Sequence, residues 1–327
     1  MEKQKNLKKA PEGLRVKHRD RSDKIFYWVL LALPLLQIAV FYFGVNFQSI
    51  LMAFQRKSGD NYIFDPKKNW NQFIGEVTAE STTMNGFWTN VVNSLKIWIF
   101  TSLAGTVLAV IFAYYIYRRR FASNFFKVML FIPSVLPAMM MVSIFKSFMD
   151  QGMPTIWAYL YQTDALEFLF KGAKEELPMV FASKPAGNLR LNLITLFTVW
   201  VSFGPQVLVY TGAMDRVDPS MLEAAKLDGA NSVQEFFKVI LPNIASTVST
   251  FLIIGVASIF TNQNNMFSFM EFSADMSEGN IGYYLFGLME KNKEGDLTYA
   301  AFIGLVFTLV VIPLAFGARK LFDRSED

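Results

Sequence analysis

The sequence predicts an all-α membrane protein that crosses the bilayer six times and keeps both termini in the cytoplasm. Hydrophobic residues make up 53% of the 327 residues, and they come in long runs rather than being spread as in a soluble domain. A run of about 20 apolar residues is long enough for a helix to span the hydrocarbon core. Lysine and arginine gather in the segments between alternate runs, which sets orientation. Together these patterns favour a polytopic membrane protein over one or two soluble domains.

The chain begins with a polar, basic segment, residues 1–24, which we expect to be a disordered cytoplasmic tail. The single histidine, His18, lies in this tail and is expected to be solvated rather than catalytic. The apolar run from residue 25 to about residue 47 is too long for the core of a signal peptide. It is predicted to be an uncleaved first transmembrane helix, with Pro34 as a candidate kink.

Five further spans are predicted, at about residues 92–117, 128–148, 191–214, from 244 onward, and 297–316. The third contains Pro133 and Pro137, which predict a bent helix. The end of the fifth is left open, because residues 261–265 (TNQNN) are strongly polar. Residues 48–92 and 149–190 are expected to form outer loops, the second with a charged patch at Glu175 and Glu176. A third outer loop carries the acidic residues Glu271, Asp275, Glu278, Glu290, Glu294 and Asp296.

Most of the 31 lysine and arginine residues lie in the tail, in the turn after the second span, in segment 215–243 and after the last span. The positive-inside rule assigns these segments to the cytoplasm. The predicted organisation is therefore a tail (1–24), a transmembrane domain (25–321) with a cytoplasmic loop at 215–243, and a short cytoplasmic end (322–327).

Segment 215–243 is polar in character although it lies between two apolar runs, which predicts a loop with its own structure. Asp218 can cap a helix whose first residue is Pro219, and Gly229 supplies its stop. Ser232 and Glu235 form the pattern of a capping box for a second short helix, which is expected to end before Pro242. The apolar residues of the two helices are Met221, Leu222, Ala224, Ala225, Leu227, Val233, Phe236, Phe237 and Ile240. On periodicity alone, such a stripe packs on its own protein or lies in the lipid interface.

The same segment resembles the EAA motif of the inner-membrane permease subunits of ATP-binding-cassette (ABC) importers. The residues that carry the resemblance are Glu223, Ala224, Ala225, Asp228, Gly229, Ala230, Phe237, Ile240, Leu241 and Pro242. The resemblance implies that this loop is a coupling helix that docks into a cleft of a cytoplasmic ATPase, with Glu223 at the contact. A carboxylate near a helix N-terminus is also where the helix dipole favours it.

Three other stretches, FQSILMAF, FFKVMLFIPSVLPAMM and TYAAFIGLVFTLVVIP, look like the maltose-type carbohydrate permeases, so the resemblance covers nearly the whole chain. The chain departs from that pattern in the stretch NNMFSFMEFSADMSEGN after the fifth span and in its long basic tail. The resemblance implies a bacterial or archaeal inner-membrane, multi-pass protein. It also implies a second permease subunit as a heterodimer partner, two ATPase subunits that hold ATP and Mg²⁺, an extracytoplasmic solute-binding protein and a sugar substrate, with no cofactor on this chain and no nucleic acid.

Two polar stripes are candidates for a solute path. In the fourth span, Thr195, Thr198, Ser202 and Gln206 recur at helical spacing, with Trp200 nearby. In the fifth span, Gly255, Ser258 and Asn262 are expected to share one face. Polar groups at bilayer depth are costly unless they face a partner or a water-filled cavity. Helix packing by small residues is the alternative. In the maltose-type permeases the sugar site lies on these two spans, which favours Ser202 and Asn262.

Catalytic chemistry is not indicated. The chain has no cysteine, which excludes disulfides and thiolate sites, and it has no phosphate-binding G-x-x-x-x-G-K-[ST] motif and no G-x-S-x-G elbow. ATP hydrolysis is therefore expected on separate subunits, and this chain is expected to be a non-catalytic transport subunit. The alternatives are a permease of the same architecture for another solute, such as a polyamine or a phosphoester, a polytopic membrane enzyme, and a stand-alone secondary transporter.

Overall fold

The structure, a computed structural model, describes residues 21–59, 61–78, 84–162, 188–271, 278–291 and 296–323. Several sequence-based assignments lie outside these residues: most of the basic tail, Glu175 and Glu176, Asp275, Glu294 and Arg324. By its internal contacts the chain divides into two units, Met1–Leu51 and Met52–Asp327, and each is described by itself.

The first unit is one long helical segment. Its elements are α1 (Arg21–Gln37), the π-helical turn η1 (Ile38–Gly44) and α2 (Val45–Ala53), whose last two residues belong to the second unit. The predicted first span is thus helical, but it is longer than expected and reaches Ala53. Pro34 lies inside α1. Taken by itself, this single helical segment leaves the side chains from residue 25 to residue 51 exposed.

The second unit begins with a small β-hairpin, so the expectation of a purely α-helical chain is wrong here. Strand β1 (Gln55–Ser58) pairs antiparallel with β2 (Asn61–Phe64), and α3 (Pro66–Thr78) follows. The buried amide nitrogen of Asn69 in α3 lies within hydrogen-bond distance of the carbonyls of Ala53 (2.9 Å), Gln55 (3.2 Å) and Thr298 (3.3 Å), which share its two N–H groups. These bonds join segments that are far apart in the sequence.

The second and third spans differ in continuity. The second runs through α4 (Met84–Trp98), the π-helical turn η2 (Ile99–Ala104) and α5 (Gly105–Tyr117). The third is broken: α6 (Ser123–Val135) meets the helical stretch Ala138–Leu160, which begins with α7 (Ala138–Ser147), at an angle of 103°. The break lies at Leu136 and Pro137, where Leu136 is extended, as the residue before a proline prefers. The predicted proline bend is confirmed and is sharper than a kink. The helix continues through the π-helical turn η3 (Phe148–Gly152) into α8 (Met153–Gln162).

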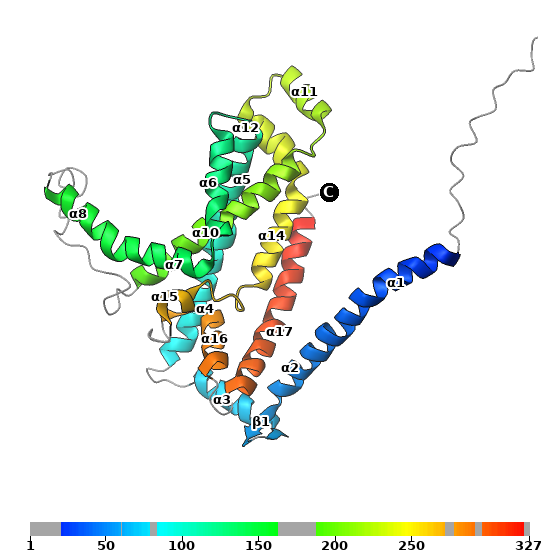
Figure 1. Ribbon diagram of the computed structural model, residues 1–327, viewed down its shortest axis with the longest axis vertical. Helices are drawn as coiled ribbons and strands as arrows, with labels where there is room; N and C mark the ends of the chain where they lie inside the picture. The colour runs from blue at the N-terminus through cyan, green and yellow to red at the C-terminus, as the bar shows by residue number, and fades with distance from the viewer. Residues whose placement is uncertain are drawn as a thin grey trace, which may run out of the picture. The chain divides into compact units, whose positions relative to one another are not determined.

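The remaining elements lead from the fourth span to the C-terminus. They are α10 (Asn188–Met214), α11 (Pro219–Leu227), α12 (Ser232–Glu235), η4 (Phe236–Ile240), α13 (Leu241–Asn243), α14 (Ala245–Ala257), α15 (Met266–Met270), α16 (Ile281–Lys291) and α17 (Asp296–Asp323). Figure 1 shows α11 and α12 at the end of the second unit where α5 and α6 meet, and α3, α15 and α16 toward the other end.

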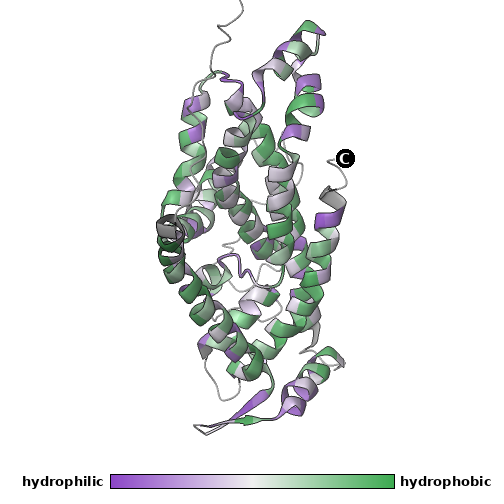
Figure 2. Cartoon of the chain, turned by 90° about the vertical axis from the view of Figure 1, so that its right-hand side faces the viewer, coloured by the Kyte–Doolittle hydropathy of each residue, from purple (hydrophilic) through white to green (hydrophobic). Residues whose placement is uncertain are grey.

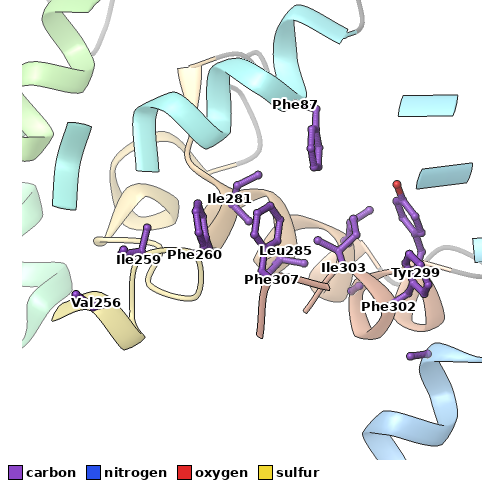
Figure 3. Packing of buried hydrophobic residues seen from close by; sticks show 13 residues of the cluster. Phe87, Val256, Ile259, Phe260, Ile281, Leu285, Tyr299, Phe302, Ile303 and Phe307 are labelled. Carbon is purple, nitrogen blue, oxygen red and sulfur yellow. The ribbon is translucent and has the colours of Figure 1, made fainter. Parts of the chain in front are cut away.

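Residues 281–291, predicted to belong to an outer loop, form helix α16. Its buried side chains include Ile281 and Leu285, and they belong to one apolar cluster with α14, α17 and Phe87 of α4 (Figure 3). Within the cluster the rings of Phe260 and Phe307 lie 4.4 Å apart. The hydroxyl of Tyr284 donates to Glu76 of α3 at 3.1 Å, and burial together with this carboxylate raises the pKa of Tyr284. The segment is helical because its apolar side chains face this core.

Four helices in the described part of the chain are long and apolar enough to cross a membrane, and the number rises to six if each of two bent helix pairs counts as one span. The second bent pair joins residues 232–243 to α14 at 67°. Figure 2 shows hydrophobic residues along the helices and hydrophilic residues at the hairpin and at the opposite ends of the helices. The chain is therefore a multi-pass membrane protein, while the count of six and the cytoplasmic termini stay predictions.

Candidate functional site

The loop between α10 and α14, residues 215–243, begins with the predicted cap. The Asp218 carboxylate accepts a hydrogen bond from the backbone N–H of Ser220 at 2.9 Å, and this bond lowers the pKa of Asp218. Pro219 is the first residue of α11, where its fixed φ suits the helix and its missing N–H costs nothing. The start of the helix therefore follows from local chemistry, as predicted.

The stop of α11 at Gly229 is also confirmed. Gly229 has φ +79°, in the left-handed region that favours glycine. Its N–H donates to the carbonyl of Lys226 at 3.1 Å, and the N–H of Ala230 donates to the carbonyl of Ala225 at 2.9 Å. The pair of bonds is a Schellman motif, which satisfies carbonyls left open at the helix end. Asp228 is the C-cap, and its N–H donates to the carbonyl of Ala224.

The capping box of the second helix lies one residue earlier than predicted. Asn231, not Ser232, is the N-cap: its Oδ1 accepts from the N–H groups of Val233 (3.0 Å) and Gln234 (2.8 Å). The Gln234 side chain returns the bond by accepting from the N–H of Asn231 at 2.9 Å. Asparagine caps helices as well as serine does, and N-x-x-Q fits the box as well as S-x-x-E, so the pattern alone could not choose.

The second helix does not end before Pro242, contrary to prediction. It continues through the π-helical turn η4 and into α13, which contains Pro242. The ring of a proline crowds the carbonyl four residues earlier, and the wider π turn directly before it relieves that contact. The chain bends after Asn243 instead, where α14 begins.

Glu235 does not take part in the capping box. It is buried and forms an ion pair with Arg118, the residue after α5. Glu235 is 3% exposed, and both of its carboxylate oxygens lie 3.0 Å from Nη1 of Arg118. Nη2 of Arg118 donates to the Ser232 hydroxyl at 3.1 Å. The hydroxyl of Tyr114 donates to the Ser232 carbonyl at 2.8 Å, and its ring lies 4.9 Å from that of Phe236. This cluster was not predicted from the sequence, in which Arg118 is only one of several basic residues in the turn after the second span.

The two faces of the loop 215–243 differ in exposure. Leu222 and Phe236 pack against the apolar cluster of α5 and α10. Exposed apolar side chains on the loop are Met221, Leu227, Val233 and Phe237, and Leu227 is 89% exposed. Glu223, Ala224, Asp228, Gly229 and Pro242 are exposed as well, whereas Ala225 and Ala230 are partly buried. Five residues of the EAA pattern and Phe237 are therefore exposed, whereas Ile240 of the same pattern is fully buried.

Glu223 does not lie near the N-terminus of its helix, contrary to prediction. Since α11 begins at Pro219, Glu223 is the fifth helical residue and lies outside the first turn, where the dipole effect is confined. Its exposed carboxylate remains available to a cation on a partner.

The polar stripe of the fourth span is helical, as predicted, but its three hydroxyls bond to their own helix. Thr195 and Thr198 donate to the carbonyls four residues earlier at 2.8 Å each, and Ser202 donates to the carbonyl of Val199 at 3.3 Å. Gln206 differs: its Oε1 is buried and has no hydrogen-bond partner among the described residues. Trp200 is exposed, with its ring 6.2 Å from that of Phe197.

The fifth-span stripe is not a helical face. Helix α14 ends at Ala257, Ser258 is its C-cap, and Asn262 lies in the turn beyond. Oδ1 of Asn262 accepts from the N–H of Asn264 at 2.8 Å, a local turn that asparagine favours over helix. Gly255 serves packing, since a Cβ there would lie 2.5 Å from Oγ of Ser102 in η2.

A polar network surrounds the turn at Asn262. The buried amide of Asn280 donates to the Asn262 carbonyl at 2.9 Å and accepts from the N–H of Tyr283. Arg190, at the start of α10, forms an ion pair with Glu278 at 2.9 Å, and both side chains are largely buried. These contacts attach the turn and α16 to the fourth span.

The sequence profile described as binding-protein-dependent transport system inner membrane component matches residues 101–326. The multiple sugar-binding transport system permease protein MsmF of Streptococcus mutans is 22% identical over 88% of this chain and 92% of its own length. The arabinooligosaccharides transport system permease protein AraP of Halalkalibacterium halodurans is 23% identical over 90% and 86%. The alpha-glucoside transport system permease protein AglF of Rhizobium meliloti is 22% identical over 93% and 83%.

Among solved structures, a chain of a bacterial ABC transporter involved in the import of the acidic polysaccharide alginate has a similar fold. The TM-score is 0.70, with 16% identity over 93% of this chain and 96% of that chain. A second structure, of a bacterial alginate ABC transporter in complex with alginate pentasaccharide-bound periplasmic protein, gives a TM-score of 0.69 over 94% and 99%, again at 16% identity.

Proposed function

We propose, from the premise that this chain belongs to the family of binding-protein-dependent transport system inner membrane components, that it is a permease subunit of an ABC importer for a sugar or oligosaccharide. Support for the substrate class comes from the relatives, whose names refer to multiple sugars, arabino-oligosaccharides and alpha-glucosides. In this proposal a second permease completes the pore, an extracytoplasmic protein delivers the solute, and two ATPase subunits bind ATP and Mg²⁺.

The observation that carries the proposal is the exposed face of the loop 215–243. Its apolar side chains Met221, Leu227 and Phe237 are exposed. Leu222 and Phe236, on the other face of the loop, pack against the apolar cluster of α5 and α10. An amphipathic helix that keeps apolar side chains exposed is suited to a groove on a partner protein. Glu223 on the same helix adds a carboxylate that an arginine of the partner can bind. The proposed partner at this face is the ATPase.

For the solute path, Gln206 is the group in the fourth span that most needs a partner. A buried amide oxygen without a hydrogen bond costs free energy, about 1–3 kcal/mol, unless water or a ligand satisfies it. A solute rich in hydroxyl groups supplies donors for that oxygen. Thr198, Ser202, Trp200, Ser258 and Asn262 stay in the proposal as candidate neighbours of the path. The hydroxyls that already bond to their own helix contribute a polar wall rather than unmet hydrogen bonds.

The test is co-purification of the ATPase with the permease. Glu223→Lys reverses the charge at the proposed contact, so we expect the variant to reach the membrane at parental abundance and to lose the ATPase. Glu290→Lys is the matched control, because Glu290 is also an exposed helical glutamate but lies on α16, at the other end of the second unit. ATPase recovered equally with Glu223→Lys and with the parent would contradict the proposed docking.

A further inference from the structure

We infer that the ion pair between Arg118 and Glu235 is the joint that transmits movement of the coupling loop to helix α5, so that both are positioning residues for coupling. The inference rests on the proposed function and deepens it. Helix α11 supplies the contact to the ATPase in that proposal, but α11 does not explain how its displacement reaches the membrane-spanning helices. The Arg118–Glu235 pair connects the loop to a span directly.

The joint has more than one point of attachment. Arg118 contacts both oxygens of the Glu235 carboxylate through Nη1 and the Ser232 hydroxyl through Nη2. Tyr114, one turn earlier on α5, donates to the Ser232 carbonyl at 2.8 Å, and its hydroxyl oxygen also lies 3.3 Å from Oε1 of Glu235. A guanidinium that uses two nitrogens on two acceptors fixes orientation as well as distance. The start of α12 therefore cannot rotate or slide on α5 without breaking several charge-assisted bonds.

Burial makes these bonds hard to replace by water. The side chain of Glu235 is 4% exposed and that of Arg118 is 26% exposed. Removing one partner of a buried pair leaves an uncompensated charge, which is strongly unfavourable, so the pair resists separation. A surface pair would be exchanged for water at little cost and would transmit little force. Glu235 is the last residue of α12, and the short turn at Gly229 joins α12 to α11. The pair therefore lies between α11 and the membrane-spanning helix α5.

From the joint, a packed path leads to the fourth span. On α5, Ala109 and Ala113 are fully buried, and they share one apolar cluster with Val207 and Tyr210 of α10. Gln206, whose buried oxygen has no described partner, is the residue next to Val207. Displacement of α12 would thus move α5 and the face of α10 that carries the candidate solute contact. Rigid helices joined by packed side chains are the physical means by which such coupling travels.

The test uses charge reversal and its restoration in the complete complex of both permeases, the ATPases and the binding protein in lipid vesicles. The variants are Arg118→Glu, Glu235→Arg and the double swap, and ATP hydrolysis is measured with binding protein and a mixture of alpha-glucosides and arabino-oligosaccharides. Arg119→Glu is the matched control: it changes the same charge in the neighbouring residue, which is exposed and outside the cluster. The double swap restores opposite charges at the same two positions.

We expect both single variants to retain the ATPase, because α11 is unchanged, and to lose the stimulated hydrolysis by about tenfold or more, the scale on which breaking a buried pair acts. The double swap should recover most of the stimulation, and Arg119→Glu should behave like the parent. Parental stimulation in the single variants, no recovery in the swap, or an equal loss in Arg119→Glu would overturn the inference.

Two further measurements keep the test decisive. If charge reversal prevents accumulation in the membrane, Glu235→Gln keeps the size of the side chain and removes its charge. The Glu235→Gln complex should retain the ATPase and lose the stimulated hydrolysis. Stimulation equal to that of the parent would overturn the inference. Because the chain has no cysteine, Phe121→Cys and Val233→Cys place spin labels on exposed positions at the two sides of the joint. In the parent, the distribution of distances between the two labels should be unchanged by ATP and vanadate. In Arg118→Glu this distribution should become broader, and equal distributions in the parent and the variant would count against the joint.

Failure of the joint is distinguishable from failure of the proposed function. A parental complex that does not retain the ATPase would contradict the function proposed for the loop. If the parental complex retains the ATPase and its hydrolysis is stimulated, single variants that behave like the parent would contradict the joint alone.

Discussion

Gly204 of α10 lies directly against the backbone carbonyl of Leu130 in α6. A Cβ built on Gly204 would fall 2.1 Å from the carbonyl oxygen of Leu130, far inside any normal contact. Helices in membranes associate through such close approaches of small residues, because lipid provides no hydrophobic force between them. The approach holds the first half of the broken third span against the fourth span.

Gly204→Ala should therefore destabilise the packing of α6 on α10. Backbone atoms cannot give way as a flexible side chain can, so we expect the overpacking to cost about 1–3 kcal/mol and to lower the midpoint of thermal unfolding in detergent. Gly212→Ala is the matched control on the same helix, since a Cβ at Gly212 would meet nothing within 4 Å. An unchanged midpoint in Gly204→Ala would show that the close contact between α6 and α10 does not contribute to stability.

Gly229→Ala should weaken the turn between α11 and α12. The position has open space around it, so the expected cost of about 1 kcal/mol arises from the left-handed φ of +79° and not from a clash. Gly229→Asn is the control, because asparagine tolerates this conformation. The measurement is the fraction of ATPase retained after washing. Equal retention by the alanine and asparagine variants would mean that the turn geometry does not govern docking.

Cysteine labelling tests the orientation of the chain. Phe121 and Val233 lie on segments that the Arg118–Glu235 pair holds together, so cysteines at both positions should react only when a membrane-impermeant thiol reagent has access to the cytoplasm. A cysteine at Glu290, at the other end of the second unit, should react from outside. The parent, which has no cysteine, reports the background. Labelling of all three positions from one side would end the predicted topology.

Gln206→Leu tests the solute path. Leucine removes the buried oxygen that lacks a described partner, so the free protein should be as stable as the parent or more stable, while uptake of labelled oligosaccharide falls. Thr211→Val is the control on the same helix, because the Thr211 hydroxyl already donates to the carbonyl of Val207 at 2.7 Å. Parental uptake by Gln206→Leu would assign the glutamine to packing.

Local signals in the sequence predicted much of the loop 215–243. Asp218 and Pro219 determine where α11 begins and Gly229 where it ends, because each acts on backbone groups within a few residues of itself. The break at Pro137 is local for the same reason. The capping box at Asn231 shows the limit of such signals. The patterns N-x-x-Q and S-x-x-E overlap there and fit a capping box equally well, and Glu235 forms an ion pair with the distant Arg118 instead.

The helical spans and their approximate order were determined by the sequence, because a long apolar run has one low-energy solution in a bilayer: a helix that satisfies its own backbone. Tertiary structure alone decided which polar residues meet. Arg118 and Glu235 are 117 positions apart, and nothing near either one specifies the other. It also decided that residues 281–291 form a helix on the core and that Asn262 leaves α14. These outcomes depend on the shape and the unpaired groups of neighbouring segments, which exist only once the helices have packed.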